Sequence, residues 1–453
     1  MNGIVQKIAK MDKAKLFLWG ILALGILMRL GYILYTPYTM GQHDTMELGS
    51  GSGHLGYIEY FLYGGSLLFD FNPMYAYEFY HPPLFHLIAA AFVRCNLALG
   101  VEYVQAFENL QYLTWLFSVI TLLLFVQIFR ELGLKGRGLL AAALVTAFHP
   151  AFYLLAGSIN NDGLCLLFMA AAIVFTLRWY KARTWKNIML LSLVIILGAL
   201  TKSNALLITP AIGFVMLYAL VTGWKDAAVR RRLIRQFVIF GVVTVPLGLS
   251  WLLLNYIRFG MPFDFTPAGL TVGSTQDVSD HTVLERFFGL KDGPLESLSL
   301  RIRNDHKDYN IIVAMLKTAV MGEYTLMSWG LEYYLLCALT AVNALLAALS
   351  VPTLIRTVVH PGKERIQKLF FALMYAVTMV FYIRFCFQYT KVCSMDFRYI
   401  TLTAVTGGAA FGWFVQEKER KRLSTVLLGL IFLWSALSIL SYLGLGLTPR
   451  AWG

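Results

Sequence analysis

The chain has 453 residues, of which 58% are hydrophobic and only 14% are charged. This composition excludes a soluble globular domain and indicates a polytopic membrane protein. The net charge of +13 would suggest a nucleic-acid partner in a soluble chain. Here the basic residues lie in short loops between apolar runs, so membrane orientation explains them and no nucleic-acid partner is expected.

Eleven apolar runs are long enough to cross a bilayer. They lie at residues 16–36, 109–130, 137–157, 162–180, 187–200, 203–222, 235–257, 330–356, 368–388, 399–415 and 424–446. The first run has the position of a signal peptide, but its length and the internal Arg29 predict that it is retained. A twelfth candidate, 82–99, contains Arg94 and two prolines.

Basic residues set the orientation of these runs. Lysines before residue 16 place the N-terminus in the cytoplasm, and Arg130, Lys135 and Arg137 mark a second inside loop. An even number of spans must separate two inside segments, and the runs 16–36 and 109–130 already supply two. Residues 82–99 are therefore predicted to form an interfacial helix on the outer face.

The same alternation, continued to the end of the chain, predicts one transmembrane domain, 1–453. It is an all-α bundle of about eleven spans with an external C-terminus. Two long external loops, 37–108 and 258–329, are expected to carry juxtamembrane helices. We expect the chain to be a multi-pass protein of the cell membrane.

The first external loop brings titratable groups close to the expected membrane surface. Asp44 follows the first span closely and is the candidate general base, which would deprotonate an acceptor hydroxyl or amine. Glu47 and His54 are candidates for a second acid or for binding an acceptor or a metal. The alternative for Asp44 is a solvated loop acid.

Two more polar residues lie at outer ends of spans. Asp162 is a second candidate acid or acceptor-binding residue, and the alternative is that it only caps the helix that follows. Lys202 interrupts apolar sequence and is a candidate ligand for a lipid-linked phosphate. Its alternative is snorkelling to the headgroups.

Further cations at outer span ends are expected to bind a donor phosphate. Arg258 and Arg398 carry guanidinium groups that grip phosphate in a bidentate fork, and His81, fixed by two following prolines, could donate to a phosphate oxygen. His43, His54 and His81 are candidate ligands of a divalent metal, but they lack the H-x-x-H spacing of common metal sites. The five cysteines show no paired spacing, so neither a disulfide framework nor a cysteine metal site is predicted.

The order of these motifs resembles the GT-C superfamily of glycosyltransferases that use polyprenyl-phosphate sugars. It is most similar to bacterial relatives of the protein O-mannosyltransferases and to the lipid A aminoarabinose transferase. The motifs in order are His43-Asp44, Gly53-His54 to Tyr57, His81 to Leu84, Asn161-Asp162, Thr201-Lys202 and Asp396 to Tyr399. The likeness covers residues 16–415.

This resemblance implies an inverting transfer of a sugar from a polyprenyl-phosphate carrier to a lipid, glycan or protein acceptor on the outer face. Asp44 would be the base, and His81, Lys202, Arg398 and Tyr399 would contact the donor phosphate. The protein O-mannosyltransferases carry adjacent Asp-Glu, whereas Thr45 follows Asp44, which puts a protein acceptor in doubt. The alternative function is a transporter or lipid flippase, which the position of the charges at one rim disfavours.

Overall fold

The described part of the chain is built from helices. The computed structural model describes residues 13–40, 44–263, 275–291, 296–302, 307–323, 330–360, 362–417 and 420–447. Within these ranges the extended pairing is limited to one isolated bridge between Asp277 and Lys391. The predicted all-α class is confirmed.

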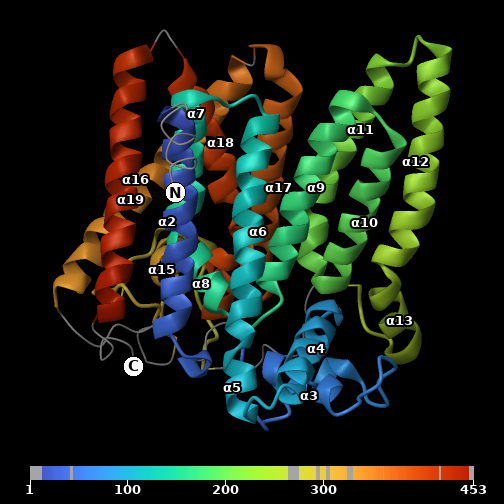
Figure 1. Ribbon diagram of the computed structural model, residues 1–453, viewed down its shortest axis with the longest axis vertical. Coiled ribbons are helices and arrows are strands. Elements are labelled where there is room, and N and C mark those ends of the chain that lie inside the picture. The colour runs from blue at the N-terminus through green and yellow to red at the C-terminus, as the bar shows by residue number, and fades with distance from the viewer. Residues whose placement is uncertain are drawn as a thin grey trace, which may run out of the picture.

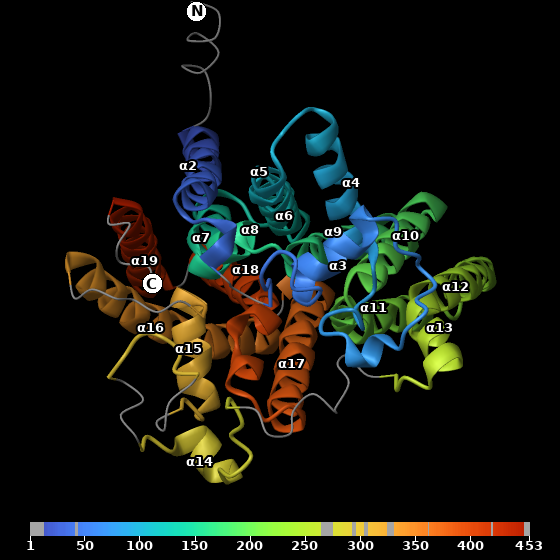
Figure 2. The same cartoon turned by 90° about the horizontal axis from the view of Figure 1, so that it is seen from below.

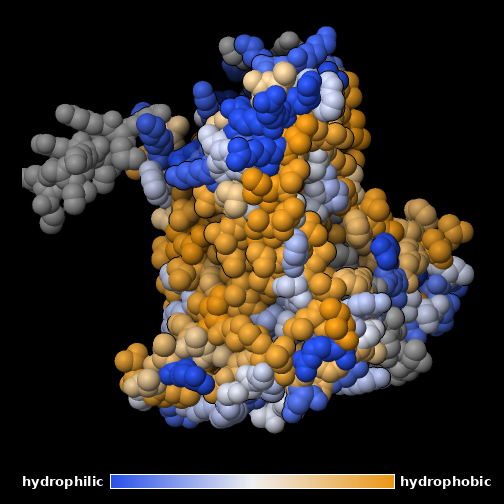
Figure 3. Space-filling view, turned by 90° about the vertical axis from the view of Figure 1, so that its right-hand side faces the viewer, coloured by the Kyte–Doolittle hydropathy of each residue, from blue (hydrophilic) through white to orange (hydrophobic). Residues whose placement is uncertain are grey.

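The described residues contain seven helical stretches long and apolar enough to cross a membrane, and nine if each of two bent helix pairs is one span. The seven are α2 (Lys13–Tyr35), Tyr103–Glu131 with α6 (Leu110–Glu131), α9 (Asp162–Ala182), Ser203–Thr222 with α11 (Thr209–Thr222), α16 (Leu331–Val359), Gly362–Gln388 with α17 (Arg365–Gln388), and α19 (Lys421–Leu447). They stand side by side along the long axis (Figure 1). On the face shown in Figure 3, apolar residues form a broad band between polar ends, as a bilayer requires.

Each of the eleven predicted spans coincides with a helix or a bent pair, but two of these helices are short. α10 (Trp185–Thr201) has 17 residues and α18 (Leu402–Gln416) has 15. At 1.5 Å per residue they reach only about 26 Å and about 23 Å, less than a typical hydrocarbon core of about 30 Å. The predicted number of eleven spans therefore stays a prediction.

The predicted span 137–157 is broken in the middle. α7 (Gly136–Phe148) and α8 (Pro150–Gly157) meet at an angle of 44°. Pro150 has no N–H, so the Thr146 carbonyl loses its helical partner. The Arg29 guanidinium replaces it, donating to the carbonyls of Thr146 (3.0 Å) and Ala147 (2.7 Å). The buried Arg29 thus supplies hydrogen-bond donors to the carbonyls at the break and holds α2 against it.

Small residues let α18 lie directly against α7. A Cβ at Gly412 would lie 2.8 Å from the Gly138 carbonyl oxygen, and one at Gly138 would lie 2.4 Å from that of Gly412. Such close backbone approach is typical of packed membrane helices. It places the short helix η7 (Phe397–Ile400), which directly precedes α18, in the interior at the lower end of the bundle.

Short helices gather at the lower end of the bundle in Figure 1. They are α3 (Gly53–Leu62), α4 (Leu84–Ala98) and α5 (Tyr103–Glu108), and Figure 2 shows them from below. α4 corresponds to the predicted interfacial helix 82–99 and packs against α3, α5, α6 and α10. α13 (Ser250–Phe259), which meets α12 (Ala227–Gly248) at 47°, lies at the same end.

The interfacial placement of 82–99 can be tested with Gly100→Cys, because Gly100 directly follows α4 in an open turn. We expect a membrane-impermeant thiol reagent to label this cysteine in intact cells, on a background in which Cys95 is replaced by serine. Labelling only after permeabilisation would mean that 82–99 spans the membrane.

Candidate active site

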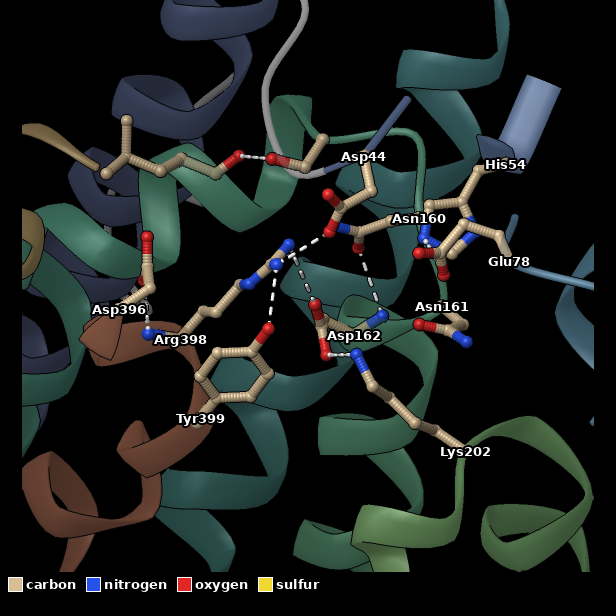
Figure 4. Close-up of polar contacts among 12 residues, drawn as sticks. Asp44, His54, Glu78, Asn160, Asn161, Asp162, Lys202, Asp396, Arg398 and Tyr399 are labelled. Carbon is tan, nitrogen blue, oxygen red and sulfur yellow. Dashed lines mark hydrogen bonds and ion pairs between the residues drawn. The ribbon is translucent and has the colours of Figure 1, made fainter. Parts of the chain in front are cut away.

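Four chain segments that are distant in sequence bring polar side chains together in the site that Figure 4 shows. The Arg398 guanidinium lies at the centre, with Nη2 2.6 Å from Asp44 Oδ2 and Nη1 3.9 Å from Asp162 Oδ2. Lys202 Nζ donates to Asp162 Oδ1 at 2.6 Å. Carboxylates and cations therefore alternate in the order Asp44, Arg398, Asp162, Lys202.

The η7 helix holds Arg398 in place. The Asp396 side chain accepts from the Arg398 backbone N–H at 2.7 Å, and Thr318 Oγ1 accepts from the Phe397 N–H at 2.9 Å. The Arg398 Nη2 also donates to Tyr399 Oη at 2.8 Å. Burial of Asp396 raises the pKa of its carboxyl group to about 8, so this group is largely protonated at neutral pH.

This raised pKa predicts how stability depends on pH. An unfolded Asp titrates at a pKa of about 4, so the folded protein keeps a proton that the unfolded chain has lost between about pH 4 and pH 8. Stability from this group is therefore complete below pH 4 and lost as pH rises through 8. Asp396→Asn keeps a good cap but cannot ionise. We expect its melting temperature in detergent to fall less between pH 5 and pH 8.5 than that of the wild type; equal falls would assign the pH dependence to other groups.

The backbone around Asp44 adopts a strained conformation. Asp44 and Met46 have φ values of +66° and +60°, and the Gly53 backbone passes so close that a Cβ there would lie 2.8 Å from the Asp44 carbonyl oxygen. Non-glycine residues rarely adopt this conformation, and where they do the strain commonly marks a functional site. The N–H of His54 fixes the loop by donating to the Asp44 carbonyl at 3.1 Å.

The Asp44 carboxylate is ionised in this arrangement. Burial is the largest influence and opposes ionisation, but the charge of Arg398 and the hydrogen bonds that Tyr77 and Arg398 donate to the carboxylate favour it. Together they hold the pKa of the Asp44 carboxyl well below its usual range. While Arg398 remains paired with it, Asp44 is therefore a weak base.

A second buried acid, Glu78, lies beside Asp44. Its φ is +71°, and its Oε2 is 3.0 Å from His81 Nε2 and 3.4 Å from His54 Nε2. Tyr80 Oη donates to its other oxygen at 3.0 Å. Burial lowers the pKa of His54 to about 4, so His54 is neutral at neutral pH and lies beside Glu78 without a positive charge.

A polar pocket opens among these groups. Its lining residues are Asp44, Tyr77, Glu78, Tyr80, His81, Lys202, Asn204, Phe385, Tyr389, Lys391, Cys393, Ser394, Arg398 and Tyr399. A second, more apolar pocket shares Asn204, Arg398 and Tyr399 with it and continues between α9, α17 and α18 along Leu166 and Met169. A polar site is thus joined to a space lined by membrane helices.

The structure brings most of the predicted site residues together. Five of them line the polar pocket: Asp44, His81, Lys202, Arg398 and Tyr399. Asp162 lines the second pocket. Asn161 occupies the cap position of α9, and Asp162 is the first helical residue with its carboxylate on Lys202, so capping alone does not explain Asp162. Lys202 is 5% exposed and points inward, which excludes snorkelling.

Three predicted residues lie elsewhere. Arg258 lines neither pocket, because its guanidinium donates to the Phe69 carbonyl at 2.6 Å and stacks on Phe259. Glu47 is exposed and lines neither pocket, whereas the buried Glu78 lines the polar one. His54 is buried behind Glu78, with its Nδ1 2.9 Å from His86 Nε2. His43 lies outside the described residues.

The predicted metal site has no formed counterpart in the described ranges. Among those residues no group of three or more His, Cys, Asp or Glu side chains could hold a metal ion. His54 and His81 both use a ring nitrogen on Glu78. The metal therefore stays a prediction.

The Asp162–Lys202 pair gives a direct test of mutual dependence. Asp162→Asn removes the charge that balances a buried ammonium, so we expect a loss of about 3 to 5 kcal/mol in the free energy of unfolding. Lys202→Gln should cost a similar amount, and the double variant less than the sum of the two. Thermal unfolding in detergent measures all three; strict additivity would mean that the two side chains do not interact.

The comparisons with known proteins agree with this architecture. Residues 80–251 match the family model described as dolichyl-phosphate-mannose-protein mannosyltransferase. Over 97% of its length the chain is similar to ArnT from Cupriavidus metallidurans, with a TM-score of 0.52 and 13% identity, and it covers 78% of that chain. Over 96% it is similar to the oligosaccharyltransferase of Archaeoglobus fulgidus, with a TM-score of 0.53 and 12% identity. No curated protein sequence matches.

These matches assign the chain to the multi-pass membrane fold that ArnT and the archaeal oligosaccharyltransferase share. The shared fold is that of GT-C glycosyltransferases, and the mannosyltransferase family model matches residues 80–251 of the chain. The chain spans about half the length of the archaeal oligosaccharyltransferase, at 56% of that chain.

Proposed function

We propose that this chain transfers a sugar from a polyprenyl-phosphate carrier to a hydroxyl or amine acceptor, with inversion at the sugar carbon. The observation that carries the proposal is the Asp44–Arg398 pair, a carboxylate and a guanidinium 2.6 Å apart in a pocket at one end of the apolar helices. A base and a phosphate ligand are the two groups that this reaction needs.

The cations of the pocket are suited to a lipid-linked phosphate. Arg398, Lys391 and Lys202 line it, and so does His81 in the loop before α4. Arginine binds phosphate oxygens in a bidentate fork, and lysine acts as a point charge. The apolar pocket that continues along α9 would take the first isoprene units of the carrier.

Donor binding would activate Asp44. A phosphate that takes up the Arg398 guanidinium removes the charge that lowers the pKa of Asp44, so the pKa of the carboxyl rises and Asp44 becomes a stronger base. Tyr77 would keep the freed carboxylate oriented through its hydrogen bond.

The transfer moves one proton, forms one bond to the sugar and breaks another. Asp44 takes the proton of the acceptor, whose oxygen or nitrogen forms a bond to the anomeric carbon from the face opposite the phosphate. The bond between that carbon and the phosphate oxygen breaks, and the polyprenyl phosphate leaves with the electron pair, stabilised by Arg398 and Lys202. The products are the glycosylated acceptor of inverted configuration and the free carrier phosphate.

Relatives support the class of donor. One structure of the Archaeoglobus fulgidus enzyme, 14% identical to this chain with a TM-score of 0.51, contains a dolichol-phosphate and an inhibitory peptide. The family model that matches residues 80–251 takes its name from dolichyl-phosphate-mannose. We propose the same donor class here, with a lipid, a glycan or a protein as acceptor.

We further propose that the site faces the outside of the cell membrane. The opposite end of the bundle carries the basic loops, including Arg178 and Lys181 on α9 and the arginines at the start of α12. Positively charged loops are retained in the cytoplasm.

Incubation of the purified protein with a panel of polyprenyl-phosphate sugars tests the function. We expect mass spectrometry to detect free polyprenyl phosphate and a glycosylated acceptor for at least one donor, and no release with Asp44→Asn. Movement of an intact lipid-linked sugar across a proteoliposome membrane, without cleavage of any donor, would contradict the proposal and favour the transporter.

A further inference from the structure

The end of α12 opposite the candidate site carries a basic groove that the transfer reaction does not use. Three turns of one helix line it, through Ala227, Arg230, Arg231, Ile234, Arg235, Val238 and Ile239. Figure 3 faces the side of the molecule on which α12 lies, with polar residues above and apolar residues below. Along α12 the arginines begin at Arg230 and end at Arg235, Ile234 lies between them, and Val238 and Ile239 follow.

The arginines of this groove are not neutralised by carboxylates. Arg231 and Arg235 are exposed and, like Arg230, make no ion pair with any residue that the structure describes. Arg230 donates to the Trp224 carbonyl at 2.8 Å and lies over its ring. The nearby Asp226 uses one carboxylate oxygen to cap α12, accepting from the N–H groups of residues 228 and 229.

Tryptophans flank the arginines at the level of a membrane interface. Arg235 lies 6.0 Å above the Trp185 ring, and Trp224 is 53% exposed beside Arg230. Tryptophan is enriched where the headgroups meet the hydrocarbon. Further along the same face, Val238 and Val242 are 58% and 69% exposed, so an acyl chain would lie against them below this level.

We propose that this groove binds an anionic phospholipid, with the phosphate on Arg231 and Arg235 and one acyl chain along Ile234 and Val238. Membrane orientation needs only net positive charge near the end of a span. Here the charges lie on ordered helical turns, four residues apart, directly above an apolar strip of the same helix. Charge complementarity selects an anionic over a zwitterionic headgroup.

Native mass spectrometry of the detergent-purified protein, with phosphatidylglycerol or phosphatidylcholine of the same acyl chains, tests this site. We expect phosphatidylglycerol to bind more tightly than phosphatidylcholine. Each lost charge should weaken binding about fivefold, so Arg231→Gln/Arg235→Gln should weaken the binding of phosphatidylglycerol about 25-fold. The binding of phosphatidylcholine should not change. The matched control is Arg420→Gln/Arg422→Gln, which removes two exposed arginines at the start of α19, at the same end of the bundle.

These measurements test lipid binding at α12 and are independent of the proposed sugar transfer. Unchanged lipid affinity in the α12 variant, or an equal loss in the control, would contradict a specific site and leave only general surface charge. Arg231→Lys/Arg235→Lys keeps the charge and should retain most of the binding. A rise in melting temperature with phosphatidylglycerol that is lost only in the α12 variant is expected as well. Sugar transfer measured in detergent tests the proposed function separately.

Discussion

Asp44→Asn is expected to reduce turnover by about 100-fold to 10,000-fold while donor binding persists, the range for loss of a general base. The substitution is conservative for the fold. Asparagine tolerates a positive φ, which is +66° at this position, and its amide oxygen can still accept from Tyr77. It cannot accept a proton from the incoming acceptor. Binding of a polyprenyl-phosphate sugar and its rate of cleavage, measured on the same preparation, separate the two effects.

Glu47→Gln is the matched control, because Glu47 is an exposed acid in the same loop. It should change turnover by less than a factor of two or so, as expected for a surface charge. Near-normal turnover of Asp44→Asn on an identified donor and acceptor would show that another group is the base. Glu78 and Asp162 would then be the next acids to replace.

Arg398→Gln should weaken donor binding by about 1.5 to 3 kcal/mol, roughly 10-fold to 150-fold, the range for hydrogen bonds to a charged group. In the structure the Arg398 guanidinium is the one shared by Asp44, Asp162 and Tyr399. Its loss removes the ligand of the phosphate and leaves Asp44 without a counter-charge. Titration with polyprenyl phosphate alone measures the binding without turnover.

Arg398→Lys refines this prediction. Lysine keeps the charge but loses the planar fork, so its affinity for the donor should fall between those of the wild type and Arg398→Gln. Arg258→Gln is the control, because Arg258 also lies at the outer end of a predicted span but bonds to Phe69. Unchanged affinity in Arg398→Gln would return Arg398 to a purely structural role.

Much of the helix pattern could be predicted because a bilayer demands long apolar runs. The break between α7 and α8 was not predicted, although Pro150 after His149 signals it, because the run stays apolar on both sides. The bend between α12 and α13 has a similar consequence. It turns α13 aside by 47°, and Arg258 therefore meets Phe69 rather than the pocket.

The candidate site was partly visible because charged residues at the ends of apolar runs are costly unless they are paired. This singled out Asp44, Lys202 and Arg398, although their pairing depends on tertiary contacts between segments far apart in sequence. Glu78 and Tyr77 were missed. They lie within an aromatic stretch of the external loop, where no periodicity shows which side chain faces inward. Glu47 was chosen for its nearness to Asp44 in sequence, but the turn at Met46 and Gly49 directs it outward.

A structure of the protein with bound polyprenyl phosphate tests directly whether Arg398 binds the donor phosphate and thereby releases Asp44. We expect the phosphate to lie within hydrogen-bonding distance of the Arg398 guanidinium and the 2.6 Å contact between Arg398 and Asp44 to be lengthened or broken. We expect the isoprenoid chain to follow the apolar pocket along α9. A phosphate bound elsewhere, with the Asp44–Arg398 pair intact, would contradict this role of Arg398.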